Sequence, residues 1–399
     1  MTRGFISQSR NMRLYAGELA LENLAKELSR LDLSRALMIC GNSVATKTRL
    51  PARIQEILGS SWAGLFGNMG KDAPISDVID AAQYAREIEA DVLIAVGAGS
   101  VLKATRVVAM LLGENKPPQD IATRFLDNAP PVSPKLLAPK IPIINVLTAA
   151  TSAQNRAGAA IHNPTGGPRL EFFDPKTRPQ SIFWDHEALL TAPPSLALST
   201  GISVLWRALM NIGAVETANP LVQASRLHAF ELARNSLPNV RNPEDAQARL
   251  NLCAAALLQN RDEDDDGRPF DAHWVASSVY ALGAALFNRV RHLDQGVTHA
   301  ILTPAAISTF YDLCPQAIQA MGIGLGLDAT DATNPLQVSE CVRRYFGGFG
   351  ITQTLGEQGV KQSDLEPVLE NSLHNFNANR KGGLHMHRER LMKILQQSL

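Results

Sequence analysis

Short uninterrupted apolar runs alternate with stretches of helical spacing along the chain up to about Asp185. Uninterrupted runs are typical of strands that are buried on both faces of a parallel sheet. The stretches between them place apolar residues three and four positions apart, as one face of a helix requires. The alternation predicts an α/β fold with a parallel sheet. The predicted strands are residues 36–40, 91–96 and 141–147, and the predicted helices are residues 78–88 and 101–112.

After Asp185 the strand patterns nearly vanish, and long segments rich in Ala and Leu follow one another. Such segments predict helices, so the second half of the chain is expected to be an all-α domain. The predicted domains are therefore residues 1–185, which are α/β, and residues 186–399. The predicted helices of the second domain are residues 195–213, 221–236, 246–259, 275–287 and 304–321.

Composition narrows the class of partner. The 399 residues are 45% apolar and 19% charged, which suits a globular protein of two domains. Lys plus Arg and Asp plus Glu both total 38, so no global basic field exists to attract nucleic acid or an anionic membrane. A small molecule is the expected partner.

The spacing of the cysteines and the length of the apolar runs indicate the cellular compartment in which the protein is expected. The four cysteines lie far apart with no Cys-x-x-Cys, which argues against a disulfide framework and a zinc knuckle. No apolar run is long enough to predict a secretion signal or a membrane span. We therefore expect a protein of the reducing cytoplasm.

The glycine turn after the second predicted strand is the first candidate site. Gly97, Ala98, Gly99 and Ser100 follow a buried strand and open a helix, so the helix N-terminus would aim its amides at a phosphate. The same turn also ends ordinary βα units. Leu102 stands at the last glycine place of a Gly-x-Gly-x-x-Gly fingerprint, which disfavours a standard Rossmann arrangement.

Several segments resemble the iron-containing alcohol dehydrogenase superfamily in the same order over almost the whole chain, and its maleylacetate reductase branch above all. Residues 15–24 resemble the entry hairpin and first helix, and residues 97–106 resemble the Gly-Gly-Gly-Ser-x-x-Asp-x-x-Lys motif. Residues 147–154 resemble the second glycine-rich turn, residues 196–209 the first ligand-bearing helix, and residues 237–249 together with Thr298-His299 the maleylacetate reductase branch. The resemblance implies a dinucleotide-binding first domain, an active site in the cleft between the domains, and a homodimer.

The residues at the superfamily's metal-ligand places depart from its pattern. One Asp and three His hold the metal in the superfamily, and Ser203, Arg207, Tyr280 and Gln295 occupy those places here. Without a one-residue insertion, Ala281 would replace Tyr280, and it is no ligand either. An arginine repels a cation. We therefore expect no bound metal.

The resemblance also implies which residues contact a dinucleotide. Gly41 stands where members that prefer NAD often have an Asp, so NAD and NADP both remain open. Lys103 and Arg106 replace the Asp and Lys of the first motif, and Ala150, Ser152 and Ala153 alter the second turn. The implied cofactor residues are Asn42, Gly97, Ala98, Gly99, Ser100, Thr148, Thr151 and Arg169.

The implied activity is reduction, by hydride from NADH or NADPH, of a small carbonyl or enone compound that carries a carboxylate. Arg207, helped by Tyr280 or Ser203, would stabilise the developing negative charge, and His292 or Tyr280 would supply a proton. Gln295 and His299 are expected to contact substrate. Two alternatives remain open. In the first, Arg207 is a salt-bridged structural arginine. In the second, the protein is a redox-neutral lyase, hydrolase or isomerase, or a non-catalytic binding protein, on the same scaffold.

Two further clusters are interpreted as surface. The acidic run from Asp262 to Asp266 predicts a solvated loop rather than a cation site. His385 and His387 lie between Lys381 and Arg388 in a predicted terminal helix, and they are expected to be solvated.

Overall fold

The computed structural model describes residues 4–126, 129–163, 169–267, 270, 272–375, 377–379 and 382–399. The chain divides into two compact units. We call Arg10–Pro194 with Asn242–Cys253 the sheet unit, and Ser195–Arg241 with Ala254–Leu399 and the residues up to Ser9 the helical unit. No helix of the described residues is both long enough and apolar enough to cross a bilayer.

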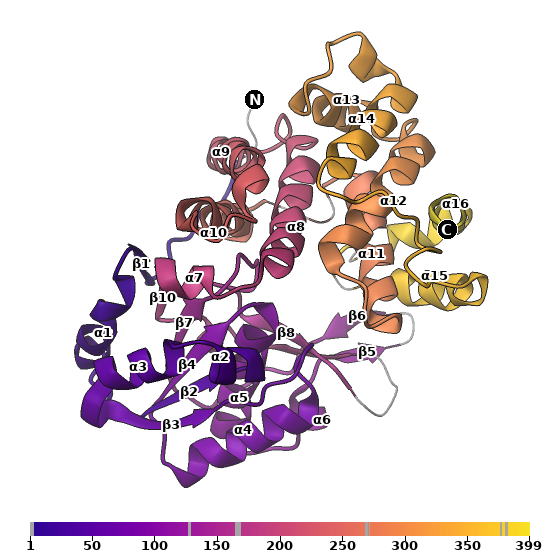
Figure 1. Ribbon diagram of the computed structural model, residues 1–399. Helices are drawn as coiled ribbons and strands as arrows, with labels where there is room; N and C mark the ends of the chain where they lie inside the picture. The colour runs from indigo at the N-terminus through magenta and orange to yellow at the C-terminus, as the bar shows by residue number, and fades with distance from the viewer. Residues whose placement is uncertain are drawn as a thin grey trace. The chain divides into compact units, whose positions relative to one another are not determined.

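The sheet unit is built on a six-stranded sheet in the order β1-β10-β7-β4-β2-β3, in which every pairing is parallel (Figure 1). The α/β prediction is confirmed. The three strands expected from apolar runs are the central ones, and each is fully buried. The strands are β1 (Arg13–Gly17), β2 (Ala36–Cys40), β3 (Trp62–Phe66), β4 (Val92–Gly97), β7 (Ile143–Leu147) and β10 (Ser181–Asp185).

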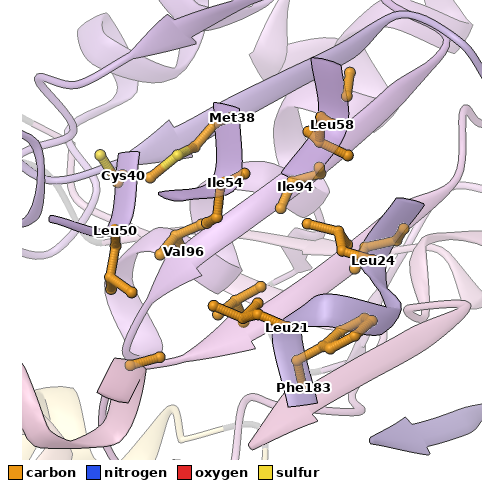
Figure 2. Close-up of a cluster of buried hydrophobic side chains, with 14 of the residues drawn as sticks. Leu21, Leu24, Met38, Cys40, Leu50, Ile54, Leu58, Ile94, Val96 and Phe183 are labelled. Carbon is orange, nitrogen blue, oxygen red and sulfur yellow. The ribbon is translucent and has the colours of Figure 1, made fainter. Parts of the chain in front are cut away.

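Side chains alternate between the two faces of these central strands. Met38, Cys40, Ile94 and Val96 point to one face, where they pack with Leu and Ile side chains of α1 (Leu24–Arg30) and α3 (Leu50–Leu58) (Figure 2). On the other face, α5 (Gly99–Glu114) packs against β4 and α4 (Ile75–Glu87). Two covered faces explain why β2 and β4 carry no polar residue. The one polar residue of β7, Asn145, is buried and donates a hydrogen bond to the carbonyl of Gln154 at 2.8 Å.

Smaller elements complete the sheet unit. Two antiparallel ribbons pair β5 (Arg124–Leu126) with β6 (Ala129–Val132) and β8 (Gly158–Ile161) with β9 (Leu170–Phe173). The expectation of an entry hairpin is wrong, because β1 pairs in parallel with β10, which lies far along the chain. The remaining helices are α2 (Asn42–Lys47), α6 (Pro118–Ile121) and α7 (His186–Leu190), with 3-10 turns at Ala20–Asn23, Gly59–Ser61 and Pro175–Thr177.

The helical unit contains no strand among its described residues, as expected. One predicted helix is wrong. Residues 304–321 belong to two helices, because α12 continues through Pro304 to Phe310 and a new helix starts at Pro315. The helices are α8 (Pro194–Ile212), α9 (Pro220–Ser236), α10 (Ala246–Asn260), α11 (Trp274–Arg289), α12 (Gln295–Phe310), α13 (Pro315–Gly324), α14 (Pro335–Gly347), α15 (Leu365–Leu373) and α16 (Arg388–Ser398), and α8 and α10 also include residues of the sheet unit.

Candidate functional site

The glycine turn of the sheet unit joins β4 to α5. Gly97 ends the strand, its carbonyl accepts a hydrogen bond from the amide of Thr148 at 3.1 Å, and α5 begins at Gly99. A Cβ atom on Gly99 would lie 3.2 Å from Oγ1 of Thr151, so the two turns approach each other closely there. The two turns that the sequence singled out therefore meet beside the first amides of a 16-residue helix.

A short chain of polar contacts continues from this turn. The Ser100 hydroxyl accepts a hydrogen bond from the Asp72 amide at 3.2 Å, and the Asp72 carboxylate pairs with Nη2 of Arg169 at 3.3 Å. Arg169 is thus held near the start of α5. Asn42, the first residue of α2, is exposed.

Lys103 lies one turn along α5 from Ser100, at the aspartate place of the family motif. Burial, with the nearby charges of Arg169 and Arg106, lowers the pKa of Lys103 to about 8, and Asp72 opposes this shift. No hydrogen bond or ion pair of its ammonium group occurs within the described part of the chain. In the sequence, Lys103 could be found because it replaces the aspartate of the first family motif with a cationic residue.

These features fit a dinucleotide. The first-turn amides of α5 and the space beside Gly99 provide the binding site that a diphosphate requires. The N-cap residue Ala98 has no polar side chain that would bind these amides instead. We name Gly97 to Ser100 with Thr148, Thr151 and Arg169 the α5 turn.

In the helical unit, Arg207 lies on α8 and is buried. Its Nη1 donates to Oδ1 of Asn260 at 2.6 Å, and its Nη2 donates to the carbonyl of Gln259 at 2.7 Å. The guanidinium carbon lies 5.0 Å from the ring centre of Phe270. A permanent positive charge is therefore fixed inside this unit.

An aromatic stack connects Arg207 to two other predicted residues. Phe270 stacks on Tyr280 with 4.0 Å between ring centres, and Tyr280 lies 5.9 Å from the ring of His299. His299 in turn packs on Trp206 at 4.1 Å. Burial lowers the pKa of His299 to about 3, so its ring is neutral near pH 7.

Ser203 and Gln295 lie where α8 and α12 cross. The crossing is close, because a Cβ on Gly296 would lie 2.8 Å from Oγ of Ser203. Gln295 is the exposed first residue of α12. His292 stands apart from the aromatic stack: it is exposed, and its Nε2 lies 2.6 Å from the carbonyl oxygen of Gln358.

This set of side chains does not fit a metal ion. Ser203, Arg207, Tyr280 and Gln295 offer a hydroxyl, a cation, a phenol and an amide, and the described residues contain no group of three His, Cys, Asp or Glu that could hold one. A fixed guanidinium also repels a cation. The chemistry of the donor set thus disagrees with the metal that the family usually binds.

The fold and the α5 turn define a class: a protein with a parallel α/β unit suited to a dinucleotide and an all-helical second unit. Family comparison gives the particular family. The model described as iron-containing alcohol dehydrogenase matches residues 11–186, and the model of the C-terminal domain of Fe-containing alcohol dehydrogenases matches residues 197–399. The chain belongs to the iron-containing alcohol dehydrogenase family, and it is an oxidoreductase of that family.

Individual relatives are distant but span nine-tenths or more of the chain. Alcohol dehydrogenase 4 of Saccharomyces cerevisiae is 24% identical over 368 residues, which cover 90% of both chains. Maleylacetate reductase of Pseudomonas aeruginosa is 22% identical over 379 residues, which cover 93% of this chain and 92% of that protein.

Solved structures share the fold. The crystal structure of a 1,3-propanediol oxidoreductase superposes with a TM-score of 0.82 at 20% identity, covering 100% of both chains. Sulfoacetaldehyde reductase from Bifidobacterium kashiwanohense in complex with NAD+ gives a TM-score of 0.78 at 15% identity, covering 98% of both chains.

Proposed function

We propose that the protein is a metal-independent, NAD(P)H-dependent reductase of a small carbonyl or enone compound that carries a carboxylate. The observation that carries this proposal is Arg207. It stands at a metal-ligand place of the family, and its guanidinium is fixed by Asn260 and Gln259 inside the helical unit. The positive charge that relatives obtain from an ion is supplied here by a side chain.

The α5 turn would hold the dinucleotide, which supplies a hydride when bound. The first amides of α5 bind the diphosphate, and the missing side chain of Gly99 leaves the space for it. Arg169 is oriented by Asp72 and adds positive charge. A sulfoacetaldehyde reductase with the same fold forms a complex with NAD+, which supports a dinucleotide as the cofactor.

Arg207 stabilises negative charge as it develops on the substrate oxygen. A preorganised cation away from water does so more strongly than the same group in water, because it needs no reorganisation during the reaction. Ser203 and Gln295 orient the substrate at the crossing of α8 and α12, and neutral His299 adds a hydrogen-bonding ring. Tyr280 or His292 supplies the proton.

The first experiment titrates the protein with NADH and with NADPH and follows nucleotide fluorescence. Saturable binding of either nucleotide is expected, and the ratio of the two dissociation constants gives the preference. Maleylacetate, the substrate in the name of several relatives, is the first compound to test for nucleotide oxidation. A folded protein that binds neither nucleotide would favour the redox-neutral or binding-protein alternative.

A further inference from the structure

A cavity of about 270 Å³ lies in the helical unit, and among its lining residues only His292 has a role in the proposed reaction. One face of α8 lines it with Ser195 and Ser199, and the start of α12 lines it with Asp294. Arg241 and His292 also line it, and all of these residues belong to the helical unit. The volume lies just below the ~300–1,000 Å³ range of ligand pockets, so the fitting ligand has only a few carbon atoms.

Arg241 provides a cation with spare hydrogen-bond donors. Within the described residues its guanidinium makes one hydrogen bond, from Nη2 to the carbonyl of Phe349 at 3.2 Å. A guanidinium carries five N–H groups, and its planar fork matches the two oxygens of a carboxylate. The single contact with Phe349 holds the Arg241 side chain and leaves its other N–H groups available to a ligand.

Asp294 provides an acceptor in the same cavity. It is the N-cap residue of α12, but its carboxylate does not cap the helix, and it forms no ion pair within the described part of the chain. Arg241 and Asp294 are therefore opposite charges that line one cavity without pairing with each other. A ligand that satisfies both carries a carboxylate for Arg241 and a hydrogen-bond donor for Asp294.

We propose that this cavity binds a small carboxylate that bears a hydrogen-bond donor, such as a hydroxycarboxylate, with its carboxylate on Arg241 and its donor on Asp294. The hydroxyl groups of Ser195 and Ser199 lie on the α8 wall and add neutral hydrogen bonds. Leu198 and Ile202 on the same helix contact the carbon skeleton. Binding here requires neither a dinucleotide nor hydride transfer, so the inference goes beyond the proposed function.

Isothermal titration calorimetry without nucleotide tests the site with three four-carbon probes. Malate carries a hydroxyl donor, aspartate an ammonium donor, and succinate neither. We expect malate or aspartate to bind saturably and at least tenfold more tightly than succinate, and the stronger of the two identifies the donor. The absence of saturable binding of malate and aspartate, or equal binding of all three probes, would overturn the proposal.

Substitutions then assign the two ends of the ligand. Arg241→Gln is expected to weaken binding of the stronger probe at least tenfold, and Arg241→Lys to weaken it less, because a lysine keeps the charge but not the fork. Asp294→Ala is expected to bring the affinities for malate and succinate together. Arg241 and Asp294 are exposed, so these variants should keep the melting temperature of the parent.

Arg234 supplies the matched control. It is also an exposed arginine of the helical unit, and its Nη1 donates to one backbone carbonyl, that of Gly324. Arg234→Gln is expected to leave malate binding unchanged. Equal weakening by Arg234→Gln and Arg241→Gln would show a general effect of surface charge and would overturn the assignment. Because NADH is absent from every arm, failure of this site and failure of the reductase proposal give separate results.

Discussion

Arg207 is the residue on which the mechanism depends, and its contacts change what its removal should do. The side chain is buried and hydrogen-bonded to Asn260 and Gln259, so Arg207→Ala leaves buried acceptors without a partner and lowers the melting temperature. If its charge also stabilises the transition state, turnover per folded molecule falls by about 100-fold or more. Steady-state kinetics and thermal melting of the same sample measure both effects.

Arg249 is a matched structural arginine for this comparison. It is buried in the sheet unit, and its Nη1 donates to the carbonyls of Leu189 and Ala192. Arg249→Ala is expected to lower the melting temperature without a comparable loss of turnover per folded molecule. An Arg207→Ala protein that is destabilised but fully active would assign Arg207 the structural role that the sequence left open.

At the scale of elements, strand β4, the α5 turn and helix α5 together form the proposed dinucleotide-binding site. Gly99→Val is expected to weaken NADH or NADPH binding at least tenfold, because the new side chain occupies the space beside Thr151 that the diphosphate needs. The φ angle of Gly99 is not positive, so the effect comes from occupied space and not from backbone strain. Fluorescence titration measures the affinity, and Gly347→Val, at an open position on α14, is the control. Unchanged affinity in a folded Gly99→Val protein would remove the turn from the site.

Two histidines on neighbouring elements, His273 before α11 and His299 on α12, link stability to pH. Burial lowers their pKa values to about 4 and about 3, from an ordinary 6.5. Nδ1 of His273 also accepts the Ala276 amide, which requires the neutral ring. Between these pKa values and 6.5 the unfolded chain binds more protons than the folded chain. Stability is therefore complete above about pH 6.5 and falls as the pH decreases, by up to about 1.4 kcal/mol per pH unit for each histidine.

Urea unfolding at several pH values between 7.5 and 4.5 measures this dependence. His299→Leu is expected to reduce the slope, and His228→Gln, at an exposed position on α9, is expected to leave it unchanged. The same slope in the parent and the His299→Leu protein would contradict the assignment.

At the scale of the whole molecule, the donor set predicts an enzyme that works without a metal ion. Metal analysis of the purified protein should find iron and zinc well below one equivalent per chain, and chelators should leave turnover unchanged. The physical reason is that a hydroxyl, a phenol and an amide beside a guanidinium cannot offset the cost of dehydrating a divalent cation. One tightly bound equivalent of iron or zinc, with activity lost to a chelator, would contradict it.

Many elements were predictable because their signal is local. The runs of β2 and β4 have no polar position and that of β7 has one, Asn145, since helices cover both faces of the sheet. The long Ala/Leu-rich segments are helices. The strand β3 gave no such signal: it is half-buried, it contains Gly64, and it lacks β-branched residues. Its strand state comes from parallel pairing with β2, which no local pattern encodes.

The acidic run from Asp262 to Asp266 shows that local sequence does not predict the burial of a side chain either. It was expected to be solvated, but Asp262 and Asp265 are fully buried, and Asp262 pairs with the buried guanidinium of Arg226 at 2.8 Å. Asp265 accepts a hydrogen bond from the Ser7 hydroxyl at 2.7 Å. For these two residues the expectation was wrong, because their partners lie far away in the sequence. His387 likewise packs against Trp274 and Phe310.

The sequence by itself determined the two kinds of unit, the family and the glycine turn, because each depends on local pattern or residue identity. Only the tertiary structure decided what surrounds each side chain: the carbonyl and amide that hold Arg207, the burial that keeps His299 neutral, and the cavity that Arg241 and Asp294 share. The physical reason is that burial and pairing depend on distances between residues far apart in the chain, and a linear pattern does not contain those distances.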